Sequence, residues 1–258
     1  MDYQEITLKI TNGVGVITLN RPEVMNALNS KMRFEITNAI KTAESNARVV
    51  VLTGAGRSFC SGQDLADGGS AAILDLEATL RDEYVPMLKA IFDCKVPTIA
   101  AVNGPAAGAG ANLALAADVV IASNDAFFVQ AFTRIGLIPD AGGTYWLPRQ
   151  IGAARAMGAA LFADKVSAEQ AVAWGMIYEA KPANEFDAHW RARADALALG
   201  PTTTYHHLKI AIRGSFENTL DEQLALEAKL QGKCGDTHDF KEGVMAFLEK
   251  RPAKFEGH

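Results

Sequence analysis

The chain has 258 residues, of which 49% are hydrophobic, and its 25 basic and 30 acidic residues give a formal net charge of −5. Such a length can bury a large core, and the lack of a basic block argues against a nucleic acid partner. Three scattered cysteines without a CxxC pair argue against disulfides or a zinc site. The acidic N-terminus shows no signal peptide and no run is long enough to span a membrane, so we expect a cytoplasmic protein without a metal ion.

The predicted elements alternate between strands and helices. The runs EITLKI and VGVITLN, separated by residues 11–13, predict a β-hairpin, and Ser30 is the expected cap of a helix over residues 31–44. The runs VVVLTG, TIAAVNG and VVIAS are continuously apolar, which is typical of strands covered on both faces. Helical stretches at 73–93 and 110–118 lie between them, so the fold class is predicted to be α/β.

From residue 142 onward the sequence consists mainly of helical segments, and MIYEA is the one possible strand. These helices are amphipathic, so they need a partner surface in their own core or in another subunit. We therefore divide the chain into a core at 1–200 and a helical portion at 201–258.

Two glycine-rich loops follow predicted strands, but neither completes a nucleotide motif. GAGRSF lacks the third glycine of a dinucleotide fingerprint, and NGPAAGAGAN lacks the Lys-Ser/Thr of a P-loop. The glycines can serve tight turns alone. Alternatively, a glycine turn that opens a helix exposes backbone N–H groups, which can stabilise an oxyanion. Two candidates are the N–H of Gln63, after Gly62 and before a short helix capped by Asp64, and the start of the helix at Ala109.

Four stretches carry a resemblance that covers essentially the whole chain. NRPEVMNALN, GRSFCSGQDL, AAVNGPAAGAGANLALAADVVIAS and GLIPDAGGTYWLPRQIG resemble the enoyl-CoA hydratase/isomerase (crotonase) superfamily. The resemblance implies repeated ββα turns in the core, a C-terminal helical part used for trimerisation, and a homotrimer or a dimer of trimers. It also implies an acyl-CoA substrate, whose coenzyme A is part of the substrate, and no separate cofactor.

The resemblance also implies roles for individual residues. The N–H groups of Gln63 and Ala109 would form the oxyanion hole. The residues implied to line the coenzyme A channel are Val24, Ala27, Ser61, Gly62, Asp64 and Leu65.

Hydratases of this superfamily resemble one another in carrying two glutamates. In this chain the corresponding positions are occupied by Asn112 and Phe132. Neither side chain exchanges a proton near neutral pH, so ordinary hydration is a poor fit. Asn112 can still hydrogen-bond a substrate, and Phe132 can line the pocket for the acyl group.

Asp140 stands where many hydratases have glycine, and this resembles the isomerase branches of the superfamily. Capping of the following turn is the alternative role for this residue type. As a base, Asp140 needs an apolar surround such as Leu137, Ile138 and Phe132 to raise its pKa by desolvation. One carboxylate suffices for isomerisation, because the proton it removes is returned to the same molecule.

The phrase IGLIPDAGGTYWLPR is most similar to ring 1,2-epoxyphenylacetyl-CoA isomerases of phenylacetate degradation, which convert 2-(1,2-epoxy-1,2-dihydrophenyl)acetyl-CoA to oxepin-CoA. This resemblance implies other phenylacetate-pathway enzymes as partners. Three alternatives stay open: a Δ3,Δ2-enoyl-CoA isomerase, an enoyl-CoA hydratase, and a non-catalytic subunit that binds acyl-CoA.

A small basic cluster near the C-terminus contains Lys250, Arg251 and Lys254. It can be a solvated tail. Related proteins imply contact with the coenzyme A phosphates through Lys254, in the same or a neighbouring subunit.

Overall fold

The structure is a computed structural model that describes residues 2–66 and 75–258. An N-terminal hairpin pairs β1 (Ile6–Thr11) with β2 (Val14–Leu19), as the sequence predicts. Asn12 and Gly13 form its two-residue turn, and both have positive φ angles. This geometry follows the twist of the flanking strands, which explains why an Asn-Gly pair lies there.

The hairpin continues into a six-stranded sheet with the order β1-β2-β3-β4-β6-β9, and its strands from β2 onward are parallel. Val50 and Leu52 of β3 pack into the main core, which also contains side chains of α1 and α3, whereas Val49 and Val51 pack with α7 on the other face. The apolar runs are therefore strands covered on both faces, and the α/β class is confirmed. The elements named here are β3 (Val49–Gly54), β4 (Thr98–Val102), β6 (Val119–Ser123), β9 (Glu179–Lys181), α1 (Ser30–Asn46), α3 (Val85–Phe92) and α7 (Ala183–Ala198).

Helix α1 begins at Ser30, one residue earlier than the start expected from a cap at Ser30. The Asn29 side chain accepts a hydrogen bond from the Met32 N–H at 2.8 Å, so Asn29 is the N-cap and the prediction of Ser30 is wrong. Both residue types cap helices well, and only the backbone conformation distinguishes them.

A second sheet joins three short strands, β5 (Ala106–Ala107), β7 (Phe127–Val129) and β8 (Val166–Ser167). β5 leads through Gly108 into α4 (Ala109–Leu115), whose residues are all buried. The prediction that MIYEA is the one strand after residue 142 is partly wrong, because β8 also lies there and β9 covers only the end of that run. Strands of two residues are too short to show a periodic pattern.

The helix expected at 73–93 is found as α2, a single π-helical turn (η3) and α3. Residues 73 and 74 lie outside the described residues, as does part of the short helix expected after Asp64. The further helical segments are η1 (Pro22–Val24), α2 (Leu76–Thr79), η3 (Leu80–Tyr84), η4 (Ala131–Ile135), α5 (Gly143–Phe162) and α6 (Ala168–Trp174).

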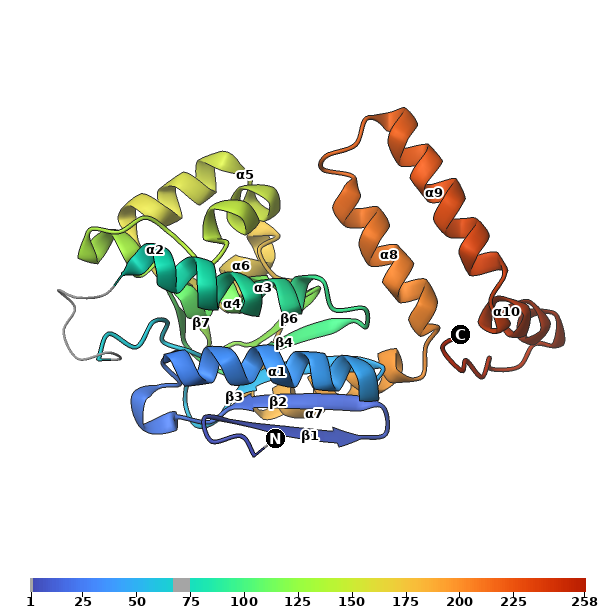
Figure 1. Cartoon of the computed structure of the whole chain (residues 1–258), viewed down its shortest axis with the longest axis horizontal. Coiled ribbons are helices and arrows are strands. Elements are labelled where there is room, and N and C mark those ends of the chain that lie inside the picture. Colours follow the sequence, from blue (N-terminus) through green and yellow to red (C-terminus); the bar gives the residue numbers. More distant parts are fainter. Residues whose placement is uncertain (1, 67–74) are drawn as a thin grey trace.

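The C-terminal helices lie to one side of the sheet (Figure 1): α8 (Thr202–Gly214) runs beside α9 (Leu220–Gly235), and α10 (His238–Glu249) follows α9 at the end where α8 begins. Lys209 and Arg213 of α8 pair with Asp118 of the core at 2.8 and 2.6 Å. Large apolar side chains on these helices are exposed, among them Leu220 at 73% and Phe247 at 83%. The division of the chain at residue 200 and the use of these helices in trimer contacts both stay predictions.

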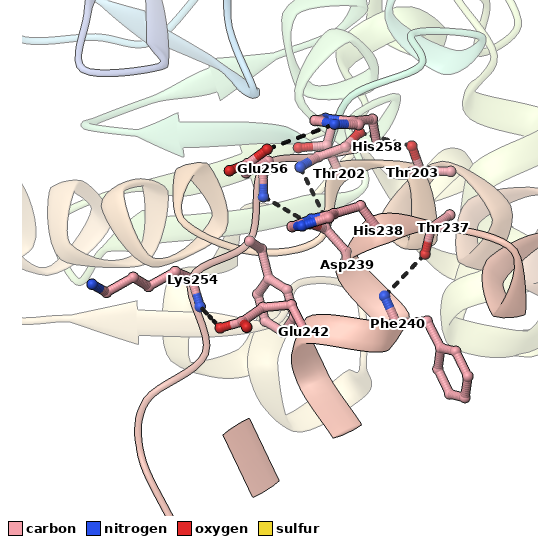
Figure 2. Close-up of polar contacts among 12 residues, drawn as sticks. Thr202, Thr203, Thr237, His238, Asp239, Phe240, Glu242, Lys254, Glu256 and His258 are labelled. Atoms are coloured by element: carbon pink, nitrogen blue, oxygen red, sulfur yellow. Dashed lines mark hydrogen bonds and ion pairs between the residues drawn. The ribbon is translucent and has the colours of Figure 1, made fainter. Parts of the chain in front are cut away.

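The last residues fold back onto the start of α10 (Figure 2). The buried Asp239 carboxylate accepts hydrogen bonds from the N–H groups of Glu256 and Gly257 at 2.7 and 2.8 Å, and its own N–H donates to the His258 carbonyl. Arg48 of the core donates to the Phe255 carbonyl at 3.1 Å. One buried carboxylate thus holds the tail against α10.

We predict that Asp239→Ala releases this tail. Hydrogen bonds to a charged group stabilise by about 1.5 to 3 kcal/mol each, so the variant should be cleaved by trypsin after Lys250 and Lys254 at least about 10-fold faster. Mass spectrometry of a proteolysis time course measures the rates. The control is Asp236→Ala, because that exposed carboxylate makes no hydrogen bond or ion pair with the described tail. Equal rates in the two variants would contradict the prediction.

Candidate active site

A cavity of about 290 Å³ lies between the loop after β3, the α2 and η3 turns, the start of α4 and the segment that follows η4. These segments are far apart in the sequence, so the cavity exists only in the folded chain. Seven predicted site residues line it: Ser61, Gly62, Gln63, Leu65, Ala109, Phe132 and Asp140.

The first candidate oxyanion donor is the N–H of Gln63. A parallel bridge fixes its backbone: Leu28 donates to the Gly62 carbonyl at 2.8 Å, and Asp64 donates to the Leu28 carbonyl at 3.1 Å. In such a bridge the N–H of the middle residue points to the side opposite the partner strand. The Gln63 N–H therefore points away from Leu28, and it has no hydrogen-bond acceptor among the described residues.

The second candidate donor is the N–H of Ala109, the first residue of α4. The N–H groups of a first helical turn have no partner within the helix. Gly62 lies directly against this turn, because a Cβ atom added to it would be 2.8 Å from the Ala107 oxygen and 3.4 Å from the Ala109 nitrogen. With a φ of +97°, Gly62 also has a conformation that favours glycine. The close contact explains how two donors from separate segments line one cavity.

Asp140 is the one carboxylic acid among the described residues that line this cavity. Its Oδ1 atom is buried and has no hydrogen-bond partner in the described part of the chain. The N-cap of α5 is Gly142, with no side-chain cap, so Asp140 does not fill the capping role considered as its alternative.

Burial raises the pKa of Asp140 to about 6, against an opposing hydrogen bond from its own backbone N–H. Phe132 and Leu137 line the same cavity and supply the expected apolar surround. The expectation for Ile138 is wrong, because that side chain is 77% exposed. A carboxyl group with this pKa is ionised at neutral pH yet basic enough to take a proton from carbon.

Asn112 is fully buried and does not line the cavity. Its side-chain amide donates to the backbone carbonyl of Asp140 at 2.7 Å, and its oxygen accepts from the Gln130 amide at 2.9 Å. The Gly143 N–H donates to the same Asp140 carbonyl at 2.8 Å. The structure thus places Asn112 behind the cavity, where it fixes the backbone of Asp140.

The segment around Val24 and Ala27 lies beside the cavity loop without lining the cavity. Arg21 donates to the Ala27 carbonyl at 2.7 Å and to the Asp64 carboxylate at 2.8 Å. The Asp64 carboxylate also accepts from the Ala66 N–H at 3.1 Å, so this acid is occupied by the chain itself. Val24 is 38% exposed, and its carbonyl accepts a hydrogen bond from the Ser61 hydroxyl at 3.3 Å. Contact of this segment with coenzyme A stays a prediction.

Lys254 lies on the tail beside α10 (Figure 2) and does not line the cavity. Its backbone N–H donates to Glu242 at 2.7 Å, and its side chain is directed away from the neighbouring labelled residues. Arg251 pairs with Glu242 and Glu249, both at 2.6 Å, so part of the basic cluster is neutralised locally. A role of Lys254 in coenzyme A binding stays a prediction.

The sequence did not indicate three polar residues of the site: Tyr84, which lines the cavity, and Arg33 and Gln130, which lie behind it. Arg33 and Tyr84 contact the Gln63 side chain, and Gln130 contacts Asn112. None of the three belongs to a recognisable motif, and their separation in the sequence follows no pattern that links them. A polar side chain within an otherwise apolar helical face, as Arg33 is in α1, was the one available signal.

Residues 2–66 and 75–258 contain no group of three or more His, Cys, Asp and Glu side chains that could hold a metal ion. Over the same residues, no helix is both long and apolar enough to cross a membrane.

Comparison with known proteins defines the class. Residues 9–258 match the family model described as enoyl-CoA hydratase/isomerase, so the chain belongs to this family. It is 60% identical to a Rhodobacter capsulatus protein named probable enoyl-CoA hydratase, over 100% of both chains. It is 44% identical to the 1,2-epoxyphenylacetyl-CoA isomerase of Escherichia coli, over 96% of this chain and 97% of that one. The crystal structure of an enoyl-CoA hydratase from Bacillus anthracis superposes with a TM-score of 0.91 at 31% identity, covering 99% and 100% of the two chains. The crotonase fold expected from the sequence is confirmed.

We predict that Asp140→Asn raises the thermal midpoint at pH 7.5, on the order of a few degrees. The pKa of Asp140 is higher in the folded chain than in the unfolded chain, so the unfolded chain releases its proton first as the pH rises from 4 to 6. The wild-type acid therefore costs stability above about pH 6, and the difference between the proteins should shrink toward pH 4.

Asp64→Asn is the matched control for this melting experiment. Burial acts to raise the pKa of Asp64, but hydrogen bonds from Arg21 and Ala66 outweigh it and hold the pKa below its usual value. This acid stabilises the fold at neutral pH, and its contribution is lost as the pH falls through the folded pKa. Its removal should lower the midpoint at pH 7.5. Shifts of the same sign in both variants would contradict the assignment.

Proposed function

We propose that the protein is an acyl-CoA isomerase in which Asp140 moves a proton through a thioester enolate. The observation that carries the proposal is the position of one half-buried carboxylate, with a pKa of about 6 and an Oδ1 atom without a hydrogen-bond partner among the described residues, in the cavity that the Gln63 and Ala109 backbones also line. A base and an oxyanion hole in one apolar cavity are the groups that enolate chemistry requires.

In the proposed reaction the thioester oxygen accepts hydrogen bonds from the N–H groups of Gln63 and Ala109. Asp140 takes a proton from the α-carbon, and the electron pair of that C–H bond forms the enolate. In a 3-enoyl-CoA the charge extends to the γ-carbon, which takes the proton back from Asp140. In the ring epoxide the C–C bond shared by the two rings breaks, so that the oxygen keeps both C–O bonds in the seven-membered ring, and Asp140 returns the proton to a ring carbon that carries the charge of the conjugated enolate. Substrate and product are isomers in both cases, so no proton or co-reactant is consumed.

Hydration fits the described cavity less well. It requires one group to activate water and one to manage the α-proton. Asn112 holds backbone behind the cavity, and Phe132 contributes an apolar wall. The described lining therefore offers one proton-transfer group instead of two.

The relatives support two different reactions. The isomerase named in Escherichia coli at 44% identity supports the ring epoxide, and the apolar wall with Phe132 suits an aromatic ring. The Rhodobacter capsulatus relative at 60% identity carries the name of a probable hydratase, which makes hydration the second candidate. We favour the epoxide, together with a place in phenylacetate breakdown beside the other enzymes of that pathway.

We also propose that the enzyme is a cytoplasmic homotrimer or dimer of trimers. The exposed apolar side chains of α8, α9 and α10 support an assembly, since such surfaces are usually covered.

We predict that Asp140→Asn lowers isomerase turnover by about 10²- to 10⁴-fold, the range typical for loss of a general base. In the wild type, the rate of α-proton exchange of phenylacetyl-CoA in D₂O should fall as the pH drops below about 6, because only the ionised carboxylate accepts the proton. Nuclear magnetic resonance measures the exchange. The variant should still bind the ligand, and near-normal exchange in it would disprove the role of Asp140. Absence of exchange in the wild type with every acyl-CoA tried would favour a non-catalytic binding subunit.

A second prediction separates the substrates. The purified protein should convert the ring epoxide faster than a linear 3-enoyl-CoA, and it should hydrate crotonyl-CoA at least about 10²-fold more slowly than it isomerises, because the second proton-transfer group is missing. Chromatography of the products and the loss of enone absorbance measure the three rates. Fast loss of crotonyl-CoA absorbance would establish the hydratase alternative.

A further inference from the structure

The side chain of Gln63 is held from two sides by residues that no motif predicts. The Tyr84 hydroxyl donates to its Oε1 atom at 2.6 Å, and Nη1 of Arg33 donates to the same atom at 2.8 Å. Both distances are short, and one of the donors is charged, so these are strong hydrogen bonds. The amide nitrogen of Gln63 donates to the Asp64 carbonyl at 3.1 Å.

Arg33 also reaches the backbone on the other side of the loop. It is 2% exposed, and Nη1 donates to the Leu28 carbonyl at 2.6 Å. Leu28 is the residue that forms the parallel bridge with Gln63. Glu83 pairs with the same guanidinium at 2.7 Å, which compensates the buried charge. Arg33 therefore joins both strands of the bridge that orients the Gln63 N–H.

Tyr84 connects this network to the cavity wall. It ends the π-helical turn η3, is 3% exposed, and lines the cavity together with Leu80 of the same turn. Single π-helical turns within helices frequently occur at functional sites. The guanidinium of Arg33 lies 4.9 Å from the centre of the Tyr84 ring, so the two residues also contact each other directly.

We propose that Tyr84 and Arg33 are positioning residues of the oxyanion hole. They hold the Gln63 side chain so that its backbone N–H keeps its direction into the cavity, and they make the acyl wall and the oxyanion donor one rigid unit. This inference rests on the proposed function, because that function assigns the Gln63 N–H to the thioester oxygen. An acyl group that packs on Tyr84 therefore contacts a residue that holds Gln63, whose N–H is the oxyanion donor.

Neither residue transfers a proton or donates a hydrogen bond to the thioester in this proposal. The Tyr84 hydroxyl is occupied by its hydrogen bond to Gln63, and Arg33 does not line the cavity. The network therefore alters how strongly the thioester carbonyl is polarised, and leaves the ionisation of Asp140 unchanged.

The test is Tyr84→Phe, which deletes one hydroxyl and keeps the ring. The matched control is Tyr3→Phe, because the Tyr3 hydroxyl also donates to a side-chain amide oxygen, that of Asn38 at 2.8 Å, away from the cavity. The probe is phenylacetyl-CoA with a ¹³C-labelled thioester carbonyl, whose stretching frequency falls when the oxygen accepts strong hydrogen bonds. Difference infrared spectroscopy measures this shift for the bound ligand, and exchange in D₂O gives the catalytic rate.

We expect Tyr84→Phe to lose much of the carbonyl shift and to slow exchange at saturation by about 10-fold, less than the 10²- to 10³-fold that deletion of an oxyanion donor costs. The apparent KM should change by less than about twofold, since ground-state binding uses the rest of the cavity. The pH below which the exchange rate falls should be the same as in the wild type. Tyr3→Phe should match the wild type in all three measurements.

A full carbonyl shift in Tyr84→Phe would overturn the proposal, as would equal behaviour of the two Tyr→Phe variants. Gln63→Met provides a second test, because in that background Tyr84→Phe should have no further effect on the carbonyl shift. An additive loss in the double variant would show that Tyr84 acts by another route. Asp140→Asn separates this inference from the proposed function: it should keep the carbonyl shift while exchange stops. Normal exchange in Asp140→Asn would show that Asp140 is not the base. The carbonyl shift would still test the positioning role of Tyr84, because it does not depend on proton transfer.

Discussion

The close contact between the loop after β3 and the start of α4 is the constraint on which the rest of the site depends. Cys60 pairs with Ala106 of β5, and the Ala107 N–H donates to the Cys60 carbonyl at 2.9 Å. Two residues later Gly62 touches the backbone at Ala107 and Ala109 with no room for a side chain. Two chain segments that far apart in sequence can present N–H groups to one cavity only if their backbones touch. The short sheet of β5, β7 and β8 therefore matters for chemistry more than its size suggests, because it fixes the position of α4.

Around that contact, hydrogen bonds to the backbone instead of ion pairs fix the position of Asp140. A cation next to Asp140 would hold its pKa low and weaken it as a base. Burial sets the pKa of Asp140 here, with Phe132 and Leu137 in the same cavity. The fixed points lie on the backbone: Asn112 and the Gly143 N–H both donate to the Asp140 carbonyl. Ala141 follows with a φ of +48°, a conformation that costs an alanine roughly 1 kcal/mol. The carboxyl group is thus held in a defined position while its pKa remains near 6.

The sequence alone predicted the hairpin, the buried strands and the alternation of strands and helices, because each leaves a periodic or continuous apolar pattern. It also located Gln63, Ala109 and Asp140, which the structure brings to one cavity. It did not predict β5, β7 and β8, since strands of two or three residues carry no period. It could not separate Asn112, behind the cavity, from residues on its wall, because α4 is buried on every side and shows no amphipathic face. Partners such as Tyr84 and Arg33 are joined through space across 51 positions of chain, and a single sequence does not record such pairs.

The geometry at Asn112 also bears on why one fold can serve either isomerisation or hydration. The resemblance places a hydratase glutamate at this position, which then needs to face the substrate. Here the side chain faces the opposite way and donates to the Asp140 carbonyl, and an ionised carboxylate in its place would present an acceptor to another acceptor. An acid at residue 112 would therefore repel the backbone that carries Asp140. Because that carbonyl belongs to the backbone, the repulsion would arise whatever residue stands at position 140, so an acid at residue 112 needs a side-chain direction different from that of Asn112.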